Sequence, residues 1–540
     1  MKNFIDFLSG NVPGGITLYL IVLFVIIFVL YYLYRNSELF SASHFKWWFL
    51  AGWLFVTLVY TYLWIGNPSS ALLKRYSVFV TASDPDNEWL AKFYRDELSS
   101  ALKPFQNRDT YFFPQNWSYL AGVELSDKKY EDICQKVGIN RVILGKIVKE
   151  KSEVKIDLQL TEYPSGKIKN QIQMNINPGK PEAVLNGLMN WVGSFLPIKK
   201  EYRFQGIVDK TFIYARDEFF KRNYKTSDKL FEEVLKRYPE NAMIKKWYNY
   251  NSIRLAATLR PDKERNPFET RKLPYVVMLS EARAFLKDLT RKNLEQKIED
   301  DFLSNMLAES YLIEENYGEA EVFLKNAYVE NRFNIYVLEN LTYLHPSRYK
   351  DLGFEDEYQL YERIVNLCPI YADVLIKYIE KLLKITPVHG VASGKAKELI
   401  ENFLGIDPNS ARSWLLLGEY YHANLNRKKA LQAYFKADSL EPNNASVQYN
   451  LGIMYHLEEE FDEAEKHFKK AIEFGDYLDA HLYLGSIYLN SGEYEKALEQ
   501  FRYRVAHKAG EDDYYAKEAM KGIRQCMQAL SIQIPAEDKE

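Results

Sequence analysis

The stretch from Ser413 to Asn444, "SWLLLGEYYHANLNRKKALQAYFKADSLEPNN", decides the fold of the carboxy-terminal part of this chain. A second stretch, "VQYNLGIMYHLEEEFDEAEKHFKKAIEFGD", repeats the same order of leucine-glycine, tyrosine-histidine, alanine, aromatic residue and alanine. A period of 34 residues indicates stacked pairs of antiparallel helices. The small residues let the two helices of a pair approach closely, and the aromatic residues fill the space around them.

Three successive units share these packing positions over residues 411–510. The matched residues are Trp414, Leu417, Gly418, Tyr421, Ala430, Tyr434, Ala437 and Pro442 in the first, Leu451, Gly452, Tyr455, Ala464, Phe468 and Ala471 in the second, and Leu484, Gly485, Tyr488, Ala497 and Phe501 in the third. This pattern resembles the tetratricopeptide repeat (TPR) family. The resemblance implies a helical solenoid that binds protein partners. Arg504 replaces the late alanine in the third unit, as is expected near the end of an array.

Weaker versions of the repeat precede the three clear units. Residues 301–334 match with Leu307, Tyr311, Ala320 and Ala327, and we expect degenerate TPR-like helical pairs over 208–410, about eight pairs in all up to residue 510. Residues 511–540 are expected to form a capping helix and a tail, since an array needs a polar outer end.

The amino-terminal region contains two long apolar runs. After an amino tail (1–15), residues 16–34 and 47–65 are uncharged runs of 19 residues, each long enough to span a bilayer. They predict a transmembrane hairpin over 16–65 that anchors the chain to a lipid bilayer. The expected localisation is an integral, multi-pass protein of a bacterial inner membrane, with its body outside the cytoplasm.

Alternating residues after the membrane region predict a small α/β domain over 75–200. "YSVFVTA" reads as a strand, Asp84-Pro85 starts a helix, and "VKIDLQLTEYPSGKI" reads as a hairpin. The order β-α-β-α-β-β-β-α resembles the amino-terminal domain of TolB, which implies a non-catalytic interaction or sensing module. The predicted fold class is therefore a TPR solenoid plus a TolB-like α/β domain and a two-helix transmembrane hairpin.

Composition excludes several functions. With 70 lysines and arginines against 73 aspartates and glutamates, the net charge of −3 argues against nucleic acid as a partner. We find no phosphate-binding loop, zinc-protease, nucleophile-elbow or dinucleotide motif, so we expect no enzyme, no catalytic residue, no cofactor and no metal. The 3 cysteines show no CxxC spacing.

The first helices of the three clear repeats are expected to line a concave groove. Its predicted partner-binding residues are Arg412, Leu415, Glu419, His422, Tyr449, Ile453, His456, Asp479, Leu482, Ser486 and Leu489. His422 and His456 occupy the same repeat position. They are either solvated groove residues, a shared partner contact or, more remotely, a pair of metal ligands.

These features predict a membrane-anchored, non-enzymatic adaptor whose groove binds a peptide or helix of another protein. Two alternatives remain open. In one, the chain is an envelope sensor whose α/β domain binds a small ligand or cell-wall fragment. In the other, it is a structural subunit of a secretion or polysaccharide-export assembly.

Overall fold

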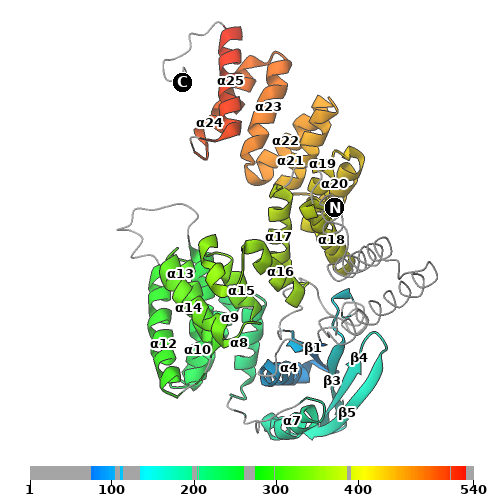
Figure 1. Cartoon of the computed structure of the whole chain (residues 1–540), viewed down its shortest axis with the longest axis vertical. Coiled ribbons are helices and arrows are strands. Elements are labelled where there is room, and N and C mark those ends of the chain that lie inside the picture. The colour runs from blue at the N-terminus through cyan, green and yellow to red at the C-terminus, as the bar shows by residue number, and fades with distance from the viewer. Residues whose placement is uncertain are drawn as a thin grey trace, which may run out of the picture. The chain divides into compact units, whose positions relative to one another are not determined.

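The structure, a computed structural model, describes residues 74–103, 110–113, 134, 136–196, 204, 206–260, 274–296, 298, 300–385, 391–510 and 512–530. The described residues fall into two compact units (Figure 1). Unit 1 comprises those up to Cys368, and unit 2 those from Pro369 onward.

Unit 1 begins with a five-stranded sheet in the order β2-β1-β3-β4-β5. Strand β1 pairs in parallel with β2 and β3, whereas β3, β4 and β5 form an antiparallel meander. Alternating apolar residues such as Val154, Ile156 and Leu158 form these strands because they place one apolar face on the core. The strands are β1 (Lys74–Ala82), β2 (Thr110–Phe112), β3 (Arg141–Glu150), β4 (Glu153–Glu162) and β5 (Lys167–Ile176).

Two helices pack on the apolar face of this sheet (Figure 1). They are α4 (Glu88–Leu102), preceded by the 3-10 turn η2 (Pro85–Asn87), and α7 (Leu185–Gly193), preceded by η4 (Pro181–Val184). The Asp84 side chain accepts a hydrogen bond from the Asn87 amide, as the predicted helix start requires. Of the second predicted helix, only Cys134 and residues 136–138 are described. The resemblance to TolB stays a prediction.

Helical pairs form the rest of unit 1. Their bounds are α8 (Lys210–Phe220), α9 (Tyr224–Arg237), α10 (Ala242–Leu259), α12 (Pro274–Gln296), α13 (Asp301–Leu312), α14 (Tyr317–Glu330), α15 (Ile335–Leu341), η5 (Pro346–Arg348), η6 (Lys350–Leu352) and α16 (Glu357–Leu367). Asn241, Asp300 and Asn334 each cap the helix that follows them. The upstream sequence therefore keeps the helix-pair architecture although its repeat signature is weak.

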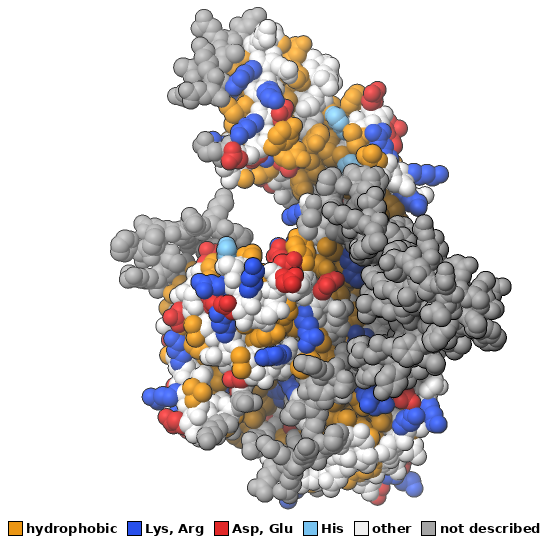
Figure 2. Space-filling view, in the orientation of Figure 1, with side chains coloured by type: hydrophobic (Ala, Val, Ile, Leu, Met, Phe, Trp, Pro, Cys, Tyr) orange, Lys and Arg blue, Asp and Glu red, His pale blue; other side chains and the backbone are white. Residues whose placement is uncertain are grey.

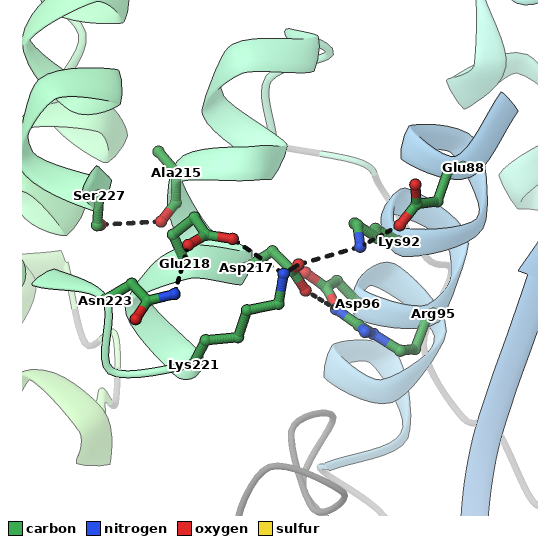
Figure 3. Close-up of polar contacts among 10 residues, drawn as sticks. All are labelled: Glu88, Lys92, Arg95, Asp96, Ala215, Asp217, Glu218, Lys221, Asn223 and Ser227. Carbon is green, nitrogen blue, oxygen red and sulfur yellow. Dashed lines mark hydrogen bonds and ion pairs between the residues drawn. The ribbon is translucent and has the colours of Figure 1, made fainter. Parts of the chain in front are cut away.

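A buried ion cluster joins the α/β domain to the first helical pair (Figure 3). Asp217 of α8 has a side chain only 1% exposed and lies 3.0 Å from Lys92 Nζ, 3.3 Å from Arg95 and 2.9 Å from Lys221 Nζ. Burial alone would raise the pKa of Asp217. Arg95, Lys92 and Lys221 outweigh that effect and hold the pKa at about 2. One carboxylate thus ties α4 to α8.

Unit 2 consists of further helix pairs and a final helix. Their bounds are α17 (Ala372–Ile385), α18 (Val391–Ile406), α19 (Ala411–Ala423), α20 (Arg427–Leu440), α21 (Ala445–Leu457), α22 (Phe461–Gly475), α23 (Leu478–Asn490), α24 (Tyr494–Ala506) and α25 (Tyr514–Ala529). Together with those of unit 1, the described residues make eight successive helix pairs. The assignment of the pairs upstream of residue 411 as degenerate repeats stays a prediction.

Close approach of the two helices in each clear repeat depends on a glycine. A Cβ atom at Gly452 would lie 2.7 Å from ring carbons of Phe468, and one at Gly485 would lie 2.7 Å from Phe501. Both rings are almost completely buried. The aromatic ring of the second helix therefore occupies the space that a side chain on the first helix would need.

The turn inside each repeat uses a left-handed residue. Leu425, between α19 and α20, has φ +56° and a side chain 79% exposed. Glu459 and Gly492 take the same conformation one and two repeats later. In unit 1, Arg222 and Glu315 take the same left-handed conformation after α8 and α13.

We predict that Leu425→Gly stabilises unit 2 by roughly 0.5–1 kcal/mol, because glycine avoids the left-handed steric cost of Cβ and no packing is lost. Hydrogen exchange of the α19 and α20 amides measures the effect. Leu425→Ala is the control, since it removes the exposed side chain but keeps Cβ. An equal gain from alanine would contradict the backbone explanation.

The predicted membrane localisation is wrong. In the part of the chain that the structure describes, no helix is long and apolar enough to cross a membrane. The long helix α12 illustrates this finding, because Arg283, Lys287 and Asp288 interrupt its apolar residues and make it amphipathic. The two runs that motivated the prediction, 16–34 and 47–65, lie outside the described residues. The integral, multi-pass localisation is withdrawn.

Candidate functional site

All eleven predicted partner-binding residues lie on the first helices of the clear repeats. Helix α19 carries Arg412, Leu415, Glu419 and His422, α21 carries Tyr449, Ile453 and His456, and α23 carries Asp479, Leu482, Ser486 and Leu489. We call the surface formed by these residues the first-helix face. Figure 2 shows hydrophobic side chains gathered over the α21 to α23 region on the viewed side.

Burial divides these residues into two groups. Leu415 is fully buried at 0% exposure and belongs to the core between α19 and α20, while Ile453 and Leu482 are each only 8% exposed. The other eight side chains are half-buried. A ligand on this face would therefore contact mainly the half-buried aromatic and polar side chains, and Leu415 would support them from beneath.

Two further tyrosines contact Tyr449 of the first-helix face. Tyr449 stacks on Tyr477 with ring centroids 4.3 Å apart and lies 6.0 Å from Tyr483. His456 meets the edge of Tyr483 at 5.6 Å. Burial raises the pKa of all three phenols, so they stay protonated and can donate hydrogen bonds. We call Tyr449, Tyr477 and Tyr483 the tyrosine cluster.

Sequence reasoning found only Tyr449 of this cluster. Tyr477 precedes α23, in the loop between two repeats, and Tyr483 stands beside the leucine-glycine signature rather than within it. Neither occupies a position that the repeat pattern marks. The signal that could have located them is the density of tyrosines: Tyr477, Tyr483 and Tyr488 fall within twelve residues.

Charged residues lie at both ends of the face. At the α19 end, Arg412 pairs with Glu380 of α17, and burial raises the pKa of nearby Glu419 despite the opposing effect of Arg412. At the α23 end, Asp479 accepts a hydrogen bond from Arg504 Nε at 3.0 Å. The face is thus apolar in its middle and carries ion pairs at its ends.

Arg504 has a structural role that the sequence interpretation missed. Its side chain is 5% exposed and donates to both carboxylate oxygens of Asp513, at 2.9 and 2.8 Å. Asp513 caps α25, and the hydrogen bonds from Arg504 hold its pKa far below the usual range. The arginine at the late alanine position therefore links the last repeat to the capping helix.

The two repeat-related histidines are partly buried. Burial lowers the pKa of both His422 and His456, so both are neutral near pH 7. The His456 ring packs against Phe461 at 5.5 Å as well as Tyr483. Within the described ranges, no group of three or more histidines, cysteines or acids could hold a metal ion.

Antiparallel helix pairs with a glycine under each aromatic ring, a left-handed turn and a capping helix define a TPR array. The tetratricopeptide repeat family model matches residues 445–474, which are α21 and α22. The chain therefore contains a tetratricopeptide repeat at residues 445–474, within a described structure that is mostly helical with a small sheet. TPR arrays are protein-interaction scaffolds, and the fold supports that general role here.

One curated relative is the BBSome complex member BBS4 of Bos taurus, 30% identical over 95 residues. The match covers 18% of this chain and 17% of that protein, so the chain spans only a small part of the relative's length.

Two solved structures are similar at low sequence identity. A tetratricopeptide repeat protein from Parabacteroides merdae aligns at 16% identity over 52% of this chain and 99% of its own, with a TM-score of 0.36. The APC/C hetero-tetramer Cut9-Hcn1 aligns at 11% identity over 59% of this chain and 56% of its own, with a TM-score of 0.39.

Proposed function

We propose that the chain is an adaptor whose first-helix face binds an extended or helical segment of another protein. The tyrosine cluster is the observation that carries this proposal. Half-buried tyrosines combine a large apolar area with a hydrogen-bonding hydroxyl and lose little side-chain entropy on binding, which is why they are frequent hot spots of interfaces. The stacked rings of Tyr449 and Tyr477 are already ordered before a partner arrives.

The charged residues at the ends of the face would help to orient a bound partner. Arg412 and Glu419 at one end and Asp479 at the other are half-buried, so a partner with complementary charges would meet them at the rim of the apolar cluster. Rim charges affect the rate of association and the choice of partner more than the affinity. The described fold supplies no feature that favours a secretion or export subunit over an adaptor.

Peptide display against the full-length chain tests this function. Peptides that bind are expected to lose about 30-fold or more in affinity for Tyr449→Ala and for Tyr483→Ala, the effect of removing an interface hot spot. Tyr317→Ala is the matched control, since Tyr317 is 48% exposed and lies in unit 1. Selected peptides that bind both cluster variants as tightly as the wild type would rule out this face as the binding site.

A further inference from the structure

Unit 1 contains a cavity that the proposed adaptor function does not use. It has a volume of about 210 Å³ and is lined by the end of α4, by β2, by α8 and α10, and by the segments that start α13 and α15. The α/β domain and the helical pairs therefore both contribute to its wall. The volume equals that of about seven waters at roughly 30 Å³ each, which suits a single substituted ring.

Aromatic side chains dominate the wall. Trp247 lies 5.7 Å from Phe302, Tyr250 meets Phe302 edge-on at 5.0 Å, and Phe302 meets Tyr336 edge-on at 6.3 Å. Such a network extends most favourably to one more flat ring, because offset and edge-to-face contacts are worth more than aliphatic contacts of equal area.

The polar lining favours a ligand that carries acceptor oxygens. The two lining acids are engaged: Lys246 Nζ lies 3.0 Å from Asp300, and Asp301 accepts from the amides of Asn331 and Asn334 at 2.9 and 2.6 Å. Two further cations, Lys103 and Arg216, also line the cavity, and Arg216 lies 3.7 Å from Asp96, which is not among the lining residues. The lining thus carries three positive and two negative charges.

Three polar atoms of lining residues have no hydrogen-bond partner in the structure. They are Ser99 Oγ, Arg216 Nε and Tyr250 Oη, and each can donate a hydrogen bond. An unpartnered buried donor is costly, so a native site that holds several has a use for them. All three atoms are shielded from solvent, and all three belong to residues that line the cavity.

We propose that this cavity binds a small aromatic carboxylic acid. The ring lies among Trp247, Tyr250 and Phe302, and the carboxylate faces the donors and the excess positive charge. Since the wall comes from both the α/β domain and the helical pairs, the ligand joins the two parts of unit 1. The proposal is independent of the first-helix face, which lies in unit 2.

Binding of benzoate to the full-length chain, followed by ligand-observed NMR and by thermal shift, tests the proposal. Ser100→Trp places a large side chain at the cavity from an exposed helix position and is expected to weaken benzoate at least tenfold. Ser439→Trp, at an exposed position of α20, is the matched control and should bind like the wild type.

Two further comparisons separate the contribution of the ligand's aromatic ring from that of its carboxylate charge. Cyclohexanecarboxylate should bind at least fivefold more weakly than benzoate, and Lys103→Glu should weaken benzoate while leaving benzamide unchanged. The proposal is overturned if benzoate does not bind, if Ser100→Trp binds it as the control does, or if cyclohexanecarboxylate binds equally well. Loss of peptide binding at the tyrosine cluster would have no bearing on these outcomes.

Discussion

Asp217→Ala is expected to destabilise unit 1 by about 3 kcal/mol. Removing one partner of a buried ion pair usually costs about 3–5 kcal/mol, because the remaining charges lose their compensation. We expect the lower end of this range, because the two cations of α4 each retain another ion pair in the variant. Lys92 lies 2.8 Å from Glu88, and Arg95 lies 2.8 Å from Asp96. Hydrogen exchange of the α4 and α8 amides measures the local loss, which suits a chain of two units better than a single melting temperature.

Glu218→Ala is the matched control on the same helix. Glu218 lies next to Asp217 and pairs with Lys221 at 2.9 Å, but its side chain is 20% exposed (Figure 3). Partly solvated pairs contribute under about 1 kcal/mol. Equal losses of hydrogen-exchange protection in the two variants would contradict the claim that the burial of Asp217 makes its ion pairs strongly stabilising.

Acid should reproduce this loss in the wild type. The pKa of Asp217 falls from 3.8 to about 2 on folding, so its charge stabilises the folded state above pH 4 and loses that contribution as the pH falls from 4 to 2. A shift of this size corresponds to roughly 2 kcal/mol. Asp217→Asn should remove this part of the acid dependence, and an unchanged pH profile in that variant would contradict the assignment.

The effect of Gly452→Ala on stability is expected to change sign when Phe468 is also replaced by alanine. This is the second large effect. Phe468→Ala alone should cost about 3–5 kcal/mol, the usual effect of truncating a buried aromatic ring. In the wild type, the new Cβ of Gly452→Ala would lie 2.7 Å from the Phe468 ring and should cost about 1–3 kcal/mol. Once the ring is gone, alanine should stabilise the helix by up to about 1 kcal/mol.

A double-mutant cycle over these two positions, read by hydrogen exchange in α21 and α22, measures the coupling. Gly318→Ala is the control, because the nearest atom to its Cβ would be 4.0 Å away and the substitution should stabilise α14. Additive effects of the two substitutions would mean that Gly452 does not serve close packing.

The sequence predicted the helix pairs well because their cause is local. A glycine at Gly418 and an aromatic at Tyr434 sit at fixed spacing, and the structure brings them into direct contact. Alternation likewise predicted β4, whose residues Val154 to Leu160 face the core at every second position. The helix pairs upstream were harder to predict, since fewer residues of the repeat pattern are present there.

The features that sequence missed depend on contacts between distant residues. In the sequence, Asp217 looks like an ordinary acidic residue of a charged helix. Its burial depends on packing against Lys92 and Arg95 of the α/β domain. The cavity of unit 1 draws on segments from Ser99 to Tyr336, which no local pattern connects. The membrane localisation was wrong for another reason. It was inferred for the whole chain from the hydropathy of two short runs, 16–34 and 47–65.

Hydrogen exchange of the full-length chain with and without a displayed peptide tests the adaptor function most directly. We predict that the peptide protects amides of the first helices α19, α21 and α23, with the largest change around Tyr449 and Tyr483, and leaves α20, α22 and α24 unchanged. Protection confined to the second helices or to unit 1 would contradict binding at the first-helix face.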